Sequence, residues 1–180
     1  MKREKIIAAL PTAIFGLLTV LFVCGLHNRA TISKTVLHVG DPAPITDLST
    51  LGADGSHFVT SAWRGRPYVI NFFASWCADC KVEHEELMTL TAGHIPVIAV
   101  LFKDKADKAA AYLDREGNPY SAIARDDEGH AATNWSINSV PETFVVDAHG
   151  IIRWHHIGGL TDQIVTDELM PVWESVKAGS

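Results

Sequence analysis

Two cysteines separated by two residues are the most reactive feature of the sequence. They lie in the run Trp76-Cys77-Ala78-Asp79-Cys80, which follows an apolar segment and precedes a segment with helical spacing. Free N–H groups and the helix dipole at a helix start stabilise a thiolate, which is the nucleophile of thiol–disulfide exchange. We therefore expect Cys77 to be the exposed attacking sulfur and Cys80 the buried resolving sulfur.

A metal site is the alternative use of these thiols. Zinc prefers four ligands and no second C-x-x-C is present, although His84 could complete a Cys-Cys-His copper site. Lys81 follows the second cysteine, so the motif is not the C-x-x-C-H haem-attachment sequence. His155-His156 could contact haem, but paired histidines at a strand end are usually solvent-exposed. We expect no metal and no cofactor beyond a redox-active Cys77–Cys80 disulfide.

Apolar runs and turns indicate the elements that must position the pair. Residues 68–73 and 97–102 are continuous apolar runs, typical of buried strands, and the residues between them have helical spacing up to Gly93. Further along we predict an exposed helix at 105–116, strands at 143–146 and 151–155 around a turn, and a closing helix at 162–177 with a break at Pro171. This order predicts an α/β fold with helices on both faces of a sheet whose first two strands are parallel.

The N-terminal segment has the pattern of a membrane anchor. Residues 6–26 carry no charge, and three basic residues precede them. About 20 apolar residues span a bilayer, and positive charge stays on the cytoplasmic side. We predict a cytoplasmic N-terminus at 1–5, a transmembrane anchor at 6–26, a linker at 27–39 and a domain outside the cytoplasm at 40–180. The alternatives are a cleaved signal peptide, with a cleavage site around Cys24, and a lipoprotein signal that ends at Cys24.

The composition argues against two classes of protein, nucleic-acid binders and disulfide scaffolds. The net charge of −6 argues against nucleic acid as a partner, because nucleic-acid binders need a basic face. Three cysteines in 180 residues do not make a disulfide scaffold. Each interpretation of the N-terminus exports the domain, and exported compartments are oxidising. A dithiol there must either form disulfides or be supplied with electrons.

Longer motifs resemble a known family. Residues 71–80, Asn-Phe-Phe-Ala-Ser-Trp-Cys-Ala-Asp-Cys, resemble the active-site junction of the thioredoxin superfamily, and Val140-Pro141 resembles its cis-proline loop. Three further segments are similar to the DsbE/CcmG family within this superfamily: residues 117–120, 141–147 and 150–153. The resemblance to this family extends over nearly the whole chain. The resemblance implies a thioredoxin-like fold at 40–180, with a central mixed β-sheet flanked by helices, and an N-terminal transmembrane helix.

The family also implies a function. Its members are membrane-anchored thiol:disulfide reductases of cytochrome c maturation, which keep the cysteines of apocytochrome c reduced before haem ligation. The expected partners are apocytochrome c or other maturation components, and a membrane electron donor of the DsbD or CcdA type. The expected location is the cell inner membrane, crossed once by residues 6–26, with the thioredoxin-like domain on the periplasmic side.

The resemblance assigns roles to a set of residues: Cys77 and Cys80 as the catalytic pair, Val140 as a substrate-binding backbone, and Trp76, Glu83, Pro141 and Glu142 as active-site support. Carboxylates near a thiolate raise its pKa, so Glu83, Glu142 and Asp79 should make the pair a reductant. Without the resemblance, both glutamates would be interpreted as solvated surface residues and Trp76 as a rim aromatic. The spacer Ala78-Asp79 departs from the proline-containing pair often found in the family.

The sequence is also compatible with three other functions. The same chemistry could serve general reduction of disulfides outside the cytoplasm. A non-catalytic module that binds haem, copper or apocytochrome on a thioredoxin scaffold is an alternative of a different class. A thiol peroxidase is a third, because residues 41–44, Asp-Pro-Ala-Pro, also occur in peroxiredoxin-like chains, but the setting of a peroxidatic cysteine is not found.

Overall fold

A computed structural model of the chain describes residues 15, 18–20, 37–52 and 56–179. The chain divides into two compact units, residues 1–35 and residues 36–180. In the first unit, residues 15 and 18–20 are helical. No helix among the described residues is both long enough and apolar enough to cross a membrane. Most of the anchor predicted over residues 6–26 lies outside the described residues.

The second unit is built around a mixed five-stranded sheet with the order β5-β4-β3-β6-β7. Its strands are β3 (Tyr68–Phe73), β4 (Val97–Phe102), β5 (Ala122–Asp126), β6 (Glu142–Val146) and β7 (Ile152–Ile157). β3 pairs with β4 in parallel and with β6 in antiparallel orientation. Every residue of β3 is buried, as expected for a continuous apolar run with both faces covered. The predicted mixed sheet and the parallel pairing of its first two strands are confirmed.

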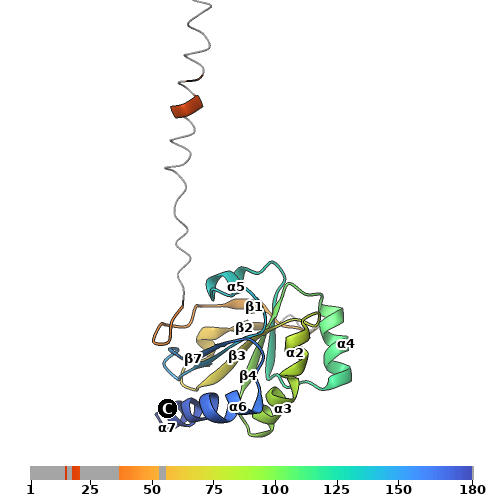
Figure 1. Cartoon of the computed structure of the whole chain (residues 1–180), viewed down its shortest axis with the longest axis vertical. Coiled ribbons are helices and arrows are strands. Elements are labelled where there is room, and N and C mark those ends of the chain that lie inside the picture. Colours follow the sequence, from red (N-terminus) through yellow and green to blue (C-terminus); the bar gives the residue numbers. More distant parts are fainter. Residues whose placement is uncertain (1–14, 16–17, 21–36, 53–55, 180) are drawn as a thin grey trace, which may run out of the picture. The chain divides into compact units, whose positions relative to one another are not determined.

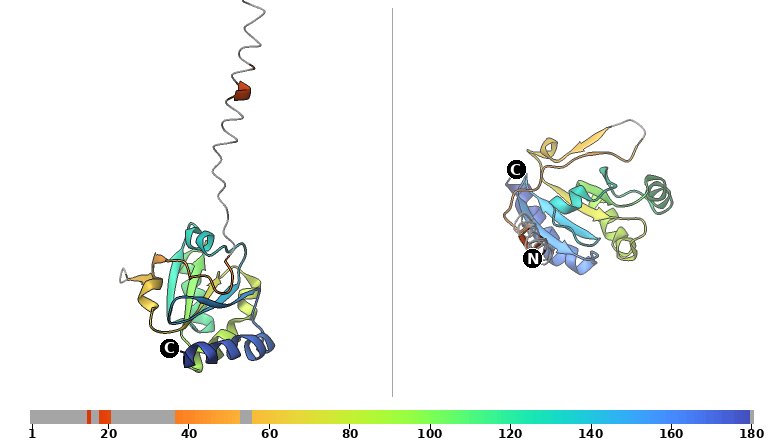
Figure 2. Two further views of the ribbon diagram at one scale, coloured as in Figure 1. Left: turned by 90° about the vertical axis from the view of Figure 1, so that its left-hand side faces the viewer. Right: turned by 90° about the horizontal axis from the view of Figure 1, so that it is seen from above.

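Two hydrophobic clusters cover the two faces of this sheet. Figure 1 shows the helices and the hairpin that lie on either side of the sheet. On one face lie the helices α3 (His84–Ala92), α4 (Ala106–Glu116) and α7 (Met170–Ala178), which contribute Leu87, Leu113 and Trp173 to the core. On the other face lie α5 (His130–Asn134) and the hairpin of β1 (Asp47–Ser49) and β2 (His57–Val59). Figure 2 shows these layers from two further directions.

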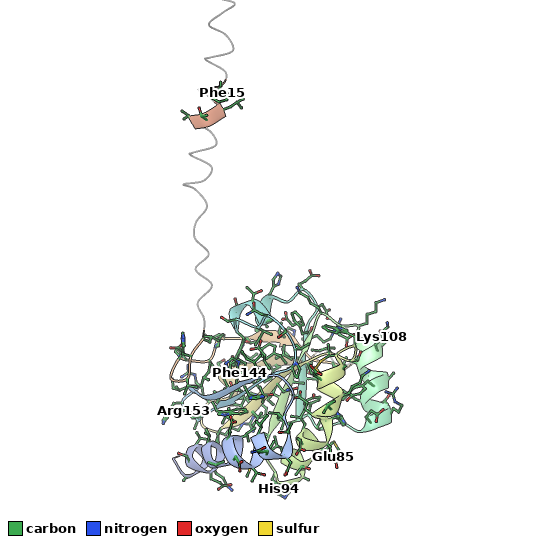
Figure 3. All side chains as sticks on the ribbon, viewed as in Figure 1. Phe15, Glu85, His94, Lys108, Phe144 and Arg153 are labelled. Carbon is green, nitrogen blue, oxygen red and sulfur yellow. A yellow bond between two sulfur atoms is a disulfide. The ribbon has the colours of Figure 1, made fainter. Side chains whose placement is uncertain are left out.

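The aromatic side chains of the second cluster pack between the sheet and α5. Trp135 contacts Phe72 and Phe144 with ring centroids 5.7 and 5.1 Å apart. Phe144 lies within the sheet, whereas Lys108 projects outward from α4 (Figure 3). Leu37, near the end of the predicted linker, also packs against this cluster.

Four elements differ from the prediction. The helix after the cysteines is divided at Glu83 into α2 (Ala78–Val82) and α3. β5 and α5 were not predicted, because residues 122–134 mix charged and small residues without a long apolar run. The closing helix consists of α6 (Asp162–Ile164), a π-helical turn (Val165–Leu169) and α7, with Pro171 in the first turn of α7. A proline has no N–H to donate, which explains a widened turn just before it.

Candidate active site

The cysteine pair forms a disulfide at the junction of β3 and α2. β3 ends at Phe73, and a turn closed by the Cys77 N–H on the Ala74 carbonyl leads into α2. Cys77 is the N-cap of α2, and its Sγ accepts a hydrogen bond of 3.1 Å from the Cys80 N–H. The pair is therefore at a helix start, where a thiolate at Cys77 would gain a hydrogen bond and the field of the helix dipole.

The expected contrast in exposure between the two cysteines is absent in the disulfide form. Each residue is only 5% exposed. The sulfurs differ in their contacts instead, because the Cys77 Sγ accepts the helix N–H and lies 3.5 Å from the Val140 carbonyl oxygen. Cys77 is thus the sulfur that faces the neighbouring loop.

That loop contains the predicted cis-proline. The Val140–Pro141 peptide bond is cis, and β6 begins immediately after it at Glu142. The Pro141 carbonyl accepts a hydrogen bond of 2.9 Å from the Gly158 N–H beyond β7. The antiparallel pairing of β6 with β3 brings this loop, distant in sequence, to the end of the sheet that carries the cysteines.

Trp76 forms the exposed rim of the site. Trp76 directly precedes Cys77 in the sequence. It is 57% exposed, which is unusual for so large an apolar residue. The indole Nε1 donates a hydrogen bond of 3.3 Å to the Lys103 carbonyl at the end of β4. Trp76 therefore presents an open aromatic face beside the disulfide.

Glu83 is fully buried, with an exposed fraction of 0%. The interpretation of Glu83 as a solvated surface residue is therefore wrong. Its Oε1 accepts a hydrogen bond of 2.9 Å from Asn71 Nδ2, and its Oε2 accepts one of 3.0 Å from the Leu160 N–H. The pKa of Glu83 is raised to about 7, mainly by burial and to a smaller extent by the charge of Asp79, although the two hydrogen bonds oppose the shift.

A polar network around Asn71 supports this carboxylate. Asn71 is the polar member of the apolar strand β3, and its Nδ2 also donates to the Thr143 hydroxyl at 3.0 Å. Its Oδ1 accepts a hydrogen bond of 3.2 Å from the Tyr120 hydroxyl, whose pKa is raised well above its ordinary value by burial. Sequence reasoning did not assign a role to Asn71 or Thr143, although a lone Asn inside an apolar strand was a usable signal.

Glu142 is likewise buried, at 3% exposure, so its interpretation as a solvated residue is also wrong. Its Oε2 accepts a hydrogen bond of 2.9 Å from His155 Nε2, and its Oε1 accepts one of 3.3 Å from the Asn138 N–H. The His155 ring stacks on Phe144 with centroids 4.0 Å apart. His155 is therefore engaged within the fold, and His156 stacks on Trp154.

The alternative copper site does not assemble around the cysteine pair. The His84 ring contacts the Tyr112 hydroxyl at 3.1 Å and the Glu116 carbonyl at 3.2 Å, both on α4. Within the described part of the chain, no group of three or more His, Cys, Asp and Glu side chains has the arrangement of a metal site.

This arrangement can carry out one kind of chemistry with its own atoms. A dithiol at a helix start can exchange with a disulfide, with no further redox group. The exposed Trp76 and the Val140 backbone border the sulfur of Cys77, and Glu83 is a buried group that can take up or release a proton near neutral pH.

Comparisons with known proteins agree with this geometry. The Redoxin family model matches residues 38–169. The thiol:disulfide interchange protein DsbE of Yersinia pestis is 33% identical over 177 residues, which cover 95% of this chain and 94% of the relative. DsbE of Escherichia coli K12 is 34% identical over 137 residues, which cover 76% of this chain and 74% of the relative.

Solved structures share the fold. A crystal structure assigned as a thiol:disulfide interchange protein DsbE from Chlorobium tepidum has a TM-score of 0.62 at 22% identity, and covers 76% of this chain and 98% of that chain. The secreted thiol-disulfide isomerase of Corynebacterium glutamicum has a TM-score of 0.63 at 20% identity, and covers 73% of this chain and 85% of that chain. At these identities the likeness shows the fold alone.

Proposed function

The chain belongs to the Redoxin family and to the DsbE/CcmG family of thiol:disulfide oxidoreductases with a thioredoxin-like fold, and on that premise we propose that Cys77 and Cys80 reduce the cysteines of apocytochrome c during cytochrome c maturation. The observation that carries the proposal is the Cys77–Cys80 disulfide at a helix start, beside the cis-proline loop and near a buried glutamate. We propose no cofactor, because the cysteine pair in its dithiol form can itself supply the two electrons.

The proposed reaction has two exchange steps. In the first, the Cys77 thiolate attacks one sulfur of a client disulfide, forms a mixed disulfide and releases the other client sulfur as a thiolate. In the second, the Cys80 thiol loses its proton and attacks the Cys77 sulfur, which releases the second client thiolate. The client gains two electrons and the protein ends as the Cys77–Cys80 disulfide.

Val140 and Trp76 are the proposed contacts for the client. The Val140 carbonyl lies 3.5 Å from Cys77 Sγ, so an extended client segment that pairs with this backbone would bring its own sulfur to Cys77. Pro141 holds this backbone in place, since its carbonyl is tied to Gly158. Trp76 supplies an apolar face to the same segment.

Glu83 is the proposed proton acceptor for Cys80. It lies about one helical turn after Cys80, and burial raises its pKa to about 7. A base with a pKa near the working pH is best suited to accept and return a proton. Its charge, together with those of Asp79 and Glu142, disfavours a stable thiolate and so favours a reductant over an oxidant.

The location is part of the proposal. Residues 1–5 would be cytoplasmic, residues 6–26 would cross the inner membrane once, and residues 27–39 would link this anchor to the thioredoxin-like domain at 40–180 on the periplasmic side. The uncharged segment 6–26 and the basic residues before it support this topology. Because the periplasm is oxidising, the pair must be recharged, and a membrane electron donor of the DsbD or CcdA type is the proposed source.

A reduction assay on the full chain tests the dithiol chemistry. The probe is an oxidised peptide that contains a C-x-x-C-H sequence. The Cys77→Ser variant is expected to have no activity, and the Cys80→Ser variant to accumulate a mixed disulfide with the peptide. Cys24→Ser, which removes the remaining cysteine, is the matched control and should leave the rate unchanged. Reduction of the peptide by Cys77→Ser contradicts the proposal.

A deletion strain tests the client. The expected result is loss of c-type cytochromes and their recovery with the wild-type chain. Normal c-type cytochromes together with defects in other disulfide proteins would indicate a general reductase. Tight retention of haem or copper by a variant that lacks both site cysteines would indicate a binding module.

A further inference from the structure

The turn that follows β4 contacts the active-site loop at two points. Asp104 Oδ2 accepts a hydrogen bond of 2.6 Å from the Ser75 N–H, and the Lys103 carbonyl accepts one of 3.3 Å from the Trp76 indole. β3 ends at Phe73, and Cys77 is the N-cap of α2. Ser75 and Trp76 lie between them, after Ala74. The turn therefore holds the segment that carries both the rim aromatic and the attacking sulfur.

The conformation of this turn is unusual. Lys103 has a φ of 46°, in the left-handed region that non-glycine residues seldom adopt. Such a residue persists where its surroundings determine its conformation, and these residues cluster at functional sites. In this conformation the Lys103 carbonyl is available to the Trp76 indole.

Contacts from the neighbouring strand fix the turn. The Lys103 N–H donates to the Asp126 carbonyl at 3.1 Å, and the Asp126 carboxylate, in a residue that is 2% exposed, accepts the Ala131 and Ala132 N–H groups of α5. The Lys103 side chain lies so close to Gly129 that a Cβ there would overlap it. The turn is thus anchored on the fold at a distance from the cysteines.

Asp104 is the member of the turn whose side chain reaches the active-site loop. Its two carboxylate oxygens have separate partners, Ser75 N–H through Oδ2 and Lys105 N–H at 2.7 Å through Oδ1. A carboxylate that accepts a backbone N–H at such a distance makes a charge-assisted bond, stronger than a neutral one. Asp104 therefore ties the start of α4 to the residue before Trp76.

We propose that Asp104 is a positioning residue that holds the Ser75–Trp76 segment so that the Trp76 indole forms a docking face for the protein client. This inference rests on the proposed reduction of protein disulfides by Cys77. A client peptide contacts the rim of the site, whereas a small disulfide needs only the sulfur. Loss of Asp104 should therefore affect the two substrates to different extents.

The test compares the reduced wild-type chain with variants on two probes, an oxidised C-x-x-C-H peptide and 2-hydroxyethyl disulfide. Asp104→Ala is expected to lower kcat/KM for the peptide about tenfold, mainly through KM, and to change the rate with the small disulfide less than about twofold. Asp104→Asn keeps one acceptor oxygen for the Ser75 N–H, so it should recover part of the loss. The matched control is Asp107→Ala, which removes an exposed acidic residue from the first turn of α4 and should behave as wild type.

Two results would overturn the proposal. One is an unchanged kcat/KM of Asp104→Ala on the peptide, and the other is an equal loss on both probes, which would indicate general damage to the fold. The wild-type rates test the dithiol chemistry itself, so a failure of the proposed function is distinguished from a failure of this inference.

A double-mutant cycle tests whether Asp104 acts through Trp76. In a Trp76→Ala background, the group that Asp104 positions is gone, so Asp104→Ala should then cost less than about twofold on the peptide. Full additivity of the two losses would show that Asp104 does not act through Trp76 and would overturn the proposal.

Discussion

Asn71 donates a hydrogen bond of 2.9 Å from its Nδ2 to Oε1 of the buried Glu83. The bond joins the central strand β3 to the point where α2 ends and α3 begins, so the carboxylate is held by the sheet itself. The same amide group also bonds Thr143 of β6. The position of Glu83 therefore depends on residues from three separate parts of the sequence. Four predictions concern Glu83 and the other buried glutamate of the site, Glu142.

The ionisation of Glu83 should make stability depend on pH. Its pKa is about 7 in the folded protein against an ordinary value of 4.5, so the folded state binds this proton more tightly than the unfolded chain. The stabilisation from this protonation is therefore fully present below pH 4.5 and is lost as the pH rises through 7. The free energy of unfolding should fall by up to about 3 kcal/mol over this range. Urea unfolding of the oxidised protein between pH 4 and 8 measures this slope. Glu83→Gln should flatten it, and an unchanged slope in that variant would contradict the assignment.

Removal of the Asn71 side chain should leave several buried groups without partners. Asn71→Ala is expected to lower the free energy of unfolding by about 2–4 kcal/mol, because Glu83, Thr143 and Tyr120 each lose a hydrogen bond in the core. Tyr120→Phe, which removes one hydroxyl from the same network, is the control and should cost about 1 kcal/mol. Equal losses in the two variants would show that Asn71 is not the centre of the network.

His155 should stabilise the buried Glu142. His155→Leu removes the hydrogen bond to Oε2, while the Asn138 N–H bond to Oε1 stays, so we expect a loss of about 1–3 kcal/mol at pH 7. Glu142→Gln in the His155→Leu background should restore part of this loss, since a neutral amide costs less to bury than a carboxylate. Chemical denaturation of the single and double variants measures the coupling, and strict additivity would argue against the pair.

Gly159 should be needed for close approach of the loop that binds Glu83. A Cβ at this position would lie 3.2 Å from the backbone oxygen of Asp79, so Gly159→Ala should move the loop from α2 and weaken the Leu160 N–H bond to Glu83. We expect a loss of about 1 kcal/mol and a further rise in the pKa of Glu83. Gly179→Ala, where the added Cβ would have only ordinary contacts of 3.7 Å or more, is the control. Identical stability of the two variants would contradict the prediction.

The parts of the fold that the sequence predicted are those with a local signal. β3 and β4 are continuous apolar runs, and the hairpin of β6 and β7 has a polar turn between two apolar segments. β5 and α5 lack such a signal. Arg125 and Asp126 interrupt the apolar pattern of β5, which is a strand because it pairs with β4. Asp126 then caps α5 with its carboxylate, a contact that spacing alone does not indicate.

The candidate site was predictable to a similar degree. The C-x-x-C spacing pointed directly to Cys77 and Cys80, and the resemblance pointed to Val140-Pro141. Residue types around Glu83 indicate a charged, exposed helix, and Glu83 is buried because the loop at Leu160, distant in sequence, folds over it. Asp104 was missed for the same reason, since its partner Ser75 belongs to another strand–helix junction.

The reduction potential of the Cys77–Cys80 pair tests the central claim most directly. Equilibration of the protein against dithiol redox buffers of known potential gives this value. A potential near or below that of thioredoxin, about −270 mV, is the predicted result, because Asp79, Glu83 and Glu142 disfavour the thiolate. A potential near −120 mV, that of a strong oxidant, would contradict the account and would assign the protein to disulfide formation instead of reduction.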